Sequence, residues 1–145
     1  MYAGAHMVHL RAIYLGLAWG LRHCLNSFWG PVHVVGDDAD ATRQQLHRTP
    51  PKGKHLKGEY WKARRLADAT AVSSWTTQTR DYNRTAREFA RMALSIDRTI
   101  EWNAGTMPAA GGRWGGVSRF IAADVAHWLR EHEKSTNLLV VEDEV

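Results

Sequence analysis

The chain has 145 residues, of which 44% are hydrophobic and 23% charged, which suits one globular domain and excludes a low-complexity or disordered chain. Nineteen lysines and arginines against fifteen aspartates and glutamates give a net charge of +4, which favours a polyanionic partner. A single cysteine excludes an intrachain disulfide, so we expect a cytoplasmic protein.

The N-terminal part of the chain predicts a long amphipathic helix and then a short strand. Apolar residues recur at three- and four-residue steps from residue 10 to residue 28. The apolar run over residues 12–21 is too short to cross a bilayer, so we expect no membrane association. Gly30 and Pro31 end the helix, and residues 32–35 have the pattern of a buried strand.

Helices and strands alternate over the next sixty residues or so. The acidic residues at 37–40 suit the start of a short helix ending at Leu46, because carboxylates stabilise a helix N-terminus. A loop over residues 49–53 leads to a basic amphipathic helix at about 56–69, and residues 72–79 predict a second strand. A helix from Asn83, its expected N-cap, to Ile96 has these residues predicted to face inward: Ala86, Phe89, Ala90, Ala93 and Leu94.

Beyond residue 96 the pattern weakens. The glycine-rich residues 105–116 predict a flexible connection, residues 118–132 a helix, and residues 138–141 a last short strand. We therefore divide the chain into a domain over residues 1–98 and a linker with a C-terminal helical extension over residues 99–145.

Two segments carry a resemblance to a known family. Residues 32–38 (VHVVGDD) place a carboxylate directly after a strand and lead into a helix that ends in Gln45-Leu46. Residues 80–94 (RDYNRTAREFARMAL) follow downstream. Together they resemble the C-terminal part of the compact plant and prokaryotic type of ribonuclease H domain, over roughly residues 6–96. The resemblance implies a partial α/β fold, with a small parallel sheet and packed helices but without the opening strands of the family.

Ribonuclease H chemistry implies four carboxylates that hold two Mg²⁺ ions to activate water and stabilise the leaving oxygen. Asp37 matches the third carboxylate and is the one candidate catalytic and metal-binding residue. The match places His9 where a glutamate belongs and Arg87 where an aspartate belongs, and no acidic residue precedes Asp37. Glu88 is a poor substitute, since one residue along a helix turns the side chain by about 100°. We predict a degenerate site; the alternative is that Asp37 only caps the following helix.

Cations gather between residues 41 and 65, where Glu59 is the sole acidic residue. Lysine and arginine contacts to phosphates give sequence-independent affinity, and an aromatic side chain can stack on exposed bases. The predicted nucleic-acid contacts are Arg43, Lys52, Lys54, Lys57, Lys62, Arg65 and Trp61. The expected ligand is an RNA–DNA hybrid or a single strand.

Three functions stay open at this point. The chain is a ribonuclease H-like domain that binds nucleic acid with little or no nuclease activity, or part of an active RNA–DNA hybrid ribonuclease completed by other sequence or a partner chain. The third is a small structural or protein-interaction domain. Parallel pairing of the two strands would support the resemblance. It would also leave an open sheet edge, which we expect the C-terminal extension, a second copy or a partner chain to cover.

Overall fold

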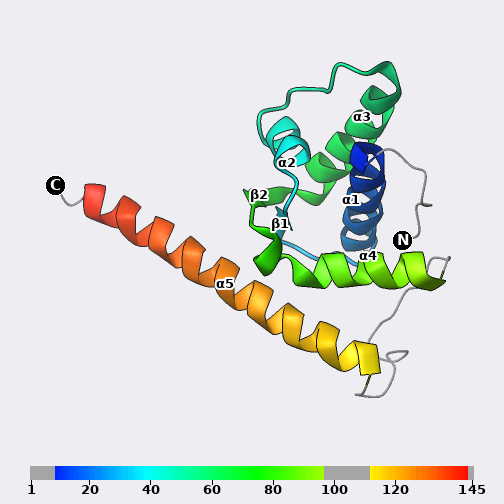
Figure 1. Ribbon diagram of the computed structural model, residues 1–145. Helices are drawn as coiled ribbons and strands as arrows, with labels where there is room; N and C mark the ends of the chain where they lie inside the picture. Colours follow the sequence, from blue (N-terminus) through cyan, green and yellow to red (C-terminus); the bar gives the residue numbers. More distant parts are fainter. Residues whose placement is uncertain (1–8, 97–111, 144–145) are drawn as a thin grey trace.

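The computed structural model describes residues 9–96 and 112–143 (Figure 1). In chain order the elements are α1 (His9–Asn26), β1 (Val32–Gly36), α2 (Ala39–Leu46), α3 (Lys54–Thr70), β2 (Val72–Thr77), the 3₁₀ helix η1 (Arg80–Tyr82), α4 (Arg84–Ile96) and α5 (Gly112–Asp143). The predicted α/β class is confirmed, and both strands lie where the sequence predicts them.

The two strands form a parallel sheet, as predicted, with α2 and α3 making the crossover between them. Val34 pairs with Trp75 and Val35 with Thr76. The ladder extends one residue past β2, because the backbone N–H of Gln78 donates to the carbonyl of Gly36 at 2.8 Å. Within the described residues the outer edge of β1 pairs with no strand.

The core lies between α1, α2 and α3, which pack together on one side of the sheet. Tyr14 of α1 and Tyr60 of α3 are fully buried and meet edge to face, with ring centroids 6.2 Å apart. Small residues surround them, and Ala41 and Ala63 allow the three helices to approach closely. The apolar face predicted for α1 is thus confirmed along the helix itself.

Polar contacts join α5 to the face of the sheet that is turned away from Val34 and Trp75. Paired residues of a parallel sheet share a face, so His33 and Thr76 point away from Val34 and its partner. The Trp128 indole N–H donates to Thr76 Oγ1 at 3.3 Å, and its ring lies 4.7 Å from that of His33. In Figure 1, α5 runs past the strands on the side away from α1 and α3. The prediction that the C-terminal extension covers the open edge of β1 is wrong for the described residues, because α5 packs on a face of the sheet instead.

The orientation predicted for α4 is wrong. Met92 is buried, whereas Phe89 is more than one-third exposed and Leu94 is 55% exposed. At the start of the helix, Asp124 of α5 accepts hydrogen bonds from the backbone N–H of Thr85 at 2.9 Å and from its hydroxyl at 2.8 Å. This anchor holds the Thr85 side of α4 against α5, whereas most of the predicted apolar face is exposed.

Removal of this anchor should destabilise the protein. Asp124→Ala leaves a helix N–H without its carboxylate cap, and we expect a loss of about 1–2 kcal/mol in the free energy of unfolding. Asp124→Asn keeps an acceptor oxygen and should lose less, and Glu133→Ala, at an exposed position of the same helix, should lose little. Chemical denaturation of the three variants measures this order. Equal stability of the alanine variant and the parent chain would contradict it.

Two predictions for the C-terminal region are wrong. Residues 138–141 are not a strand, and Gly112–Gly116 are not part of a loop, because both lie inside the continuous helix α5. A short apolar run fits a strand and a helix equally well, and here the helix begun upstream continues through it. The predicted domain boundary at residue 98 and most of the predicted connection lie outside the described residues. None of the helices described over residues 9–96 and 112–143 combines the length and apolar character that a bilayer crossing requires.

Candidate nucleic-acid interface

The carboxyl end of β1 carries the acidic residues that the sequence singled out. Asp37 follows the strand directly and is half-buried. Asp38, not Asp37, caps α2, because its Oδ1 accepts from the backbone N–H of Ala41 at 2.9 Å. The alternative in which Asp37 is the helix cap is therefore wrong.

The first turn of α1 reaches the same end of the sheet. His9 Nε2 lies 3.3 Å from Asp38 Oδ2, so the histidine stands beside the acidic end of β1, where the resemblance predicts a metal ligand. Its contact is with Asp38, which sequence matching did not single out. The signal that could have found it is the position of His9 in the first turn of α1, which contacts α2, the helix that Asp38 caps.

These donors do not fit a two-metal site. Two magnesium ions need several carboxylate oxygens in tight octahedral geometry. Among the described residues, no group of three or more histidine, cysteine, aspartate or glutamate side chains could hold a metal. Arg87 is exposed on α4, and the neighbouring Glu88 pairs with Arg91 at 3.3 Å.

Three basic residues of α3 share one outward face with Trp61. Steps of three and four residues separate Lys54, Lys57, Trp61 and Arg65, which places them in a row along the helix. Tyr60 and Ala63 occupy the buried side, so this row points to solvent, and Trp61 is 48% exposed. Arg65 Nε donates to the carbonyl of Trp61 at 3.3 Å, which steadies the end of the row. We call these four residues the α3 face; Lys62 is exposed beside it.

Ion pairing distinguishes the α3 face from other cations of the protein. Arg48 and Arg64 both bind Asp68, at 3.1 and 3.0 Å. Partial burial opposes ionisation of Asp68, but hydrogen bonds from the two guanidinium groups hold its pKa below its usual value. By contrast, within the described residues no carboxylate pairs with the cations at positions 52, 54, 57, 62 and 65.

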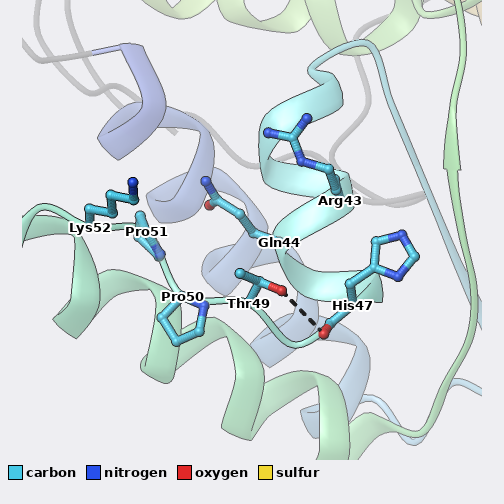
Figure 2. A pocket seen from close by; sticks show the side chains of 7 residues that line it. All are labelled: Arg43, Gln44, His47, Thr49, Pro50, Pro51 and Lys52. Carbon is cyan, nitrogen blue, oxygen red and sulfur yellow. Dashed lines mark hydrogen bonds between the residues drawn. The ribbon is translucent and has the colours of Figure 1, made fainter.

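A hollow of about 420 Å³ opens between α2 and the loop that leads to α3. Figure 2 shows its lining: Arg43, Gln44, His47, Thr49, Pro50, Pro51 and Lys52. Arg43 pairs with Asp40 at 2.7 Å, so it offers less free charge than Lys52. Gln44 is held from behind by the Tyr14 hydroxyl, which donates to its Oε1 at 2.7 Å; burial raises the pKa of that hydroxyl and keeps it a donor.

The structure therefore divides the predicted nucleic-acid residues into two groups. Lys54, Lys57, Trp61 and Arg65 lie together on the α3 face, with Lys62 exposed beside them, and Arg43 and Lys52 line the hollow beside its N-terminal end. Sequence reasoning did not identify Arg48 and Arg64 as structural residues, although the four-residue step from Arg64 to Asp68 was visible.

The parallel pair of strands, the helical crossover and the carboxylate after β1 define a partial fold of the ribonuclease H-like class. A family model described as Reverse transcriptase-like matches residues 2–93. This match covers more than half of the chain, so the chain belongs to the reverse transcriptase-like family, whose fold is ribonuclease H-like. No curated protein and no solved structure gives a significant match.

Proposed function

We propose that this ribonuclease H-like domain binds nucleic acid and has little or no RNA–DNA hybrid nuclease activity of its own. The observation that carries the proposal is the α3 face, where cations that pair with no carboxylate of the described residues flank the exposed indole of Trp61. Cations without carboxylate partners are available to phosphates, and an exposed ring between them can contact a sugar or base. A cytoplasmic location is part of the proposal and is supported by the single cysteine.

The ligand we propose is an RNA–DNA hybrid or a single strand. A row of cations along one helix follows a phosphate backbone without reading its sequence. Lys52 in the hollow extends the positive charge beyond the N-terminal end of α3, and Arg43 lies on the opposite wall. Family membership supports the same ligand class.

Low nuclease activity is proposed from the donor set at the end of β1. If Mg²⁺ binds there, Asp37 is the residue that we expect to contribute a carboxylate. By the resemblance to ribonuclease H, two of the other carboxylate positions hold His9 and Arg87, which supply no carboxylate, and Arg87 adds a positive charge.

A second candidate is a part of an active RNA–DNA hybrid ribonuclease. The outer edge of β1 favours it, because this edge pairs with no strand in the described residues and offers free backbone donors and acceptors. A second copy or a partner chain could pair there and bring further carboxylates to Asp37. Cleavage of a hybrid only when another chain is added would favour this candidate.

Fluorescence anisotropy with labelled single strands and hybrid duplexes tests the binding proposal. At about 50 mM salt we expect dissociation constants in the micromolar range, which rise steeply as salt is added. A chain that binds neither ligand at low salt is not a nucleic-acid-binding protein, and the proposal then fails.

A further inference from the structure

The C-terminal end of α1 has an unusual residue at its turn. The N–H of Trp29 donates to the carbonyl of Cys24 at 3.0 Å, and the N–H of Phe28 donates to that of Leu25 at 3.2 Å. This is the Schellman pattern, in which the left-handed position normally belongs to glycine. Here Phe28 takes that position, with φ of 56°. A bulky side chain is strained in this conformation, so the helix end is less stable than a glycine would make it.

The strained residue also fails to bury its ring. Phe28 is 96% exposed, and Trp29 beside it is 59% exposed. The Trp29 ring lies 5.2 Å from that of His23, and Trp19, which is 42% exposed, precedes this histidine by one helical turn. We call these four residues, Trp19, His23, Phe28 and Trp29, the aromatic tip. Single exposed apolar residues need no explanation, but several exposed aromatic rings at one end of a helix are the kind of apolar patch that binds a partner.

The charge around the aromatic tip identifies the partner. Arg22 is exposed on the same end of α1, and no aspartate or glutamate occurs in the chain before Asp37. A surface of flat rings with positive and no negative charge on its own segment fits a polyanion that carries flat rings itself. Single-stranded nucleic acid has this chemistry, because its unpaired bases can stack on aromatic side chains.

The position of the aromatic tip connects it with the α3 face. Arg11 of α1 lies 3.9 Å from Glu59 of α3, and farther along both helices the Thr70 hydroxyl donates to the carbonyl of Leu21 at 3.4 Å. The two helices therefore run in the same direction, side by side (Figure 1). The α3 face runs from Lys54 toward the same end of the helix pair at which the aromatic tip lies.

We propose that the aromatic tip stacks the bases of a single strand whose phosphates lie along the α3 face. The proposal rests on the proposed nucleic-acid-binding function and adds to it a preference for unpaired bases over a duplex. In a duplex the bases are already stacked on one another, so the aromatic tip gains little from a hybrid.

The test compares a labelled oligothymidylate of about 16 nucleotides with an RNA–DNA hybrid of the same length, by fluorescence anisotropy. In the double variant Phe28→Gly with Trp29→Ser, single-strand affinity should fall about tenfold or more, while hybrid affinity should change less than about twofold. Phe28→Tyr keeps a ring, and Leu94→Ala removes an exposed aliphatic side chain elsewhere; both should bind the single strand as the parent chain does. Phe28→Gly alone should raise the thermal midpoint, by roughly 3 °C, because it relieves the strained turn.

The outcomes are distinguishable. Single-strand binding that survives in the double variant but is lost when the α3 face is neutralised overturns the stacking proposal and leaves nucleic-acid binding intact. Equal loss of both ligands in the double variant also overturns it, because the contact would then not involve unpaired bases. A parent chain that binds neither ligand removes the proposed function and the stacking proposal together.

Discussion

Alanine at Lys54, Lys57, Lys62 and Arg65 should weaken nucleic-acid binding by about 100-fold or more at moderate salt. Each of these cations is exposed and lacks a carboxylate partner within the described residues, so each is free to displace a counterion from a phosphate. The slope of log affinity against log salt should become shallower by about three, because four phosphate contacts are lost. Anisotropy titrations at several salt concentrations measure both effects.

A charge-matched control separates local contact from net charge. Alanine at Arg87, Arg91, Arg119 and Arg130 also removes four positive charges, from exposed positions on α4 and α5. This variant should retain most of the affinity and most of the salt slope. The reverse pattern would place the nucleic acid on α4 and α5 and contradict the assignment to the α3 face.

Truncation after Ser95 should give an aggregating or poorly folded protein. It removes α5, and with it the buried Val117, the Asp124 cap of α4 and the Trp128 ring that covers one face of the sheet. A two-stranded parallel sheet with one bare face and an open edge buries too little to be stable alone. Size-exclusion chromatography and thermal unfolding monitored by circular dichroism test this expectation.

A second truncation provides the control. A chain ending at Lys134 keeps every side chain of α5 that is described in contact with the sheet or α4, including Trp128. It should elute and unfold as the full chain does. If residues 1–95 instead form a soluble monomer that unfolds cooperatively, α5 is not needed for the fold.

The local patterns of residues 9–77 predict the fold well. The apolar spacing of α1 matches a helix that packs on one side. The β-branched run before Asp37 forms the predicted strand, although no residue of β1 is fully buried and His33 is exposed. In both cases the sequence pattern and the tertiary packing select the same structure, so periodicity is a sufficient guide.

The C-terminal third could not be predicted in the same way. The orientation of α4 is set by long-range contacts with α5, among them Thr85 to Asp124 and Arg84 to the Phe120 ring, which the apolar pattern of α4 does not reveal, and Leu94 is exposed. The continuation of α5 through residues 138–141 depends on the helix already formed upstream, which a short apolar run does not reveal. Tertiary context decides both features.

The candidate site was predicted in part. The cations of the α3 face were identified by composition, and helical spacing groups them, but pairing could not be inferred from the sequence. Arg48 and Arg64 form ion pairs with Asp68, and Arg43 forms an ion pair with Asp40, so these three arginines have structural partners. Asp38 rather than Asp37 caps α2, because α2 begins at Ala39 and the N-cap is the residue directly before it.

The central claim is that the chain binds an RNA–DNA hybrid without hydrolysing it. One reaction tests this claim most directly. A labelled RNA–DNA hybrid is incubated with a saturating concentration of the full chain and Mg²⁺, and binding and strand integrity are measured in the same sample. We expect the hybrid to be bound and its RNA strand to stay intact. Cleavage of the RNA strand that disappears in Asp37→Asn would contradict the account, because it would show a working metal site at the end of β1.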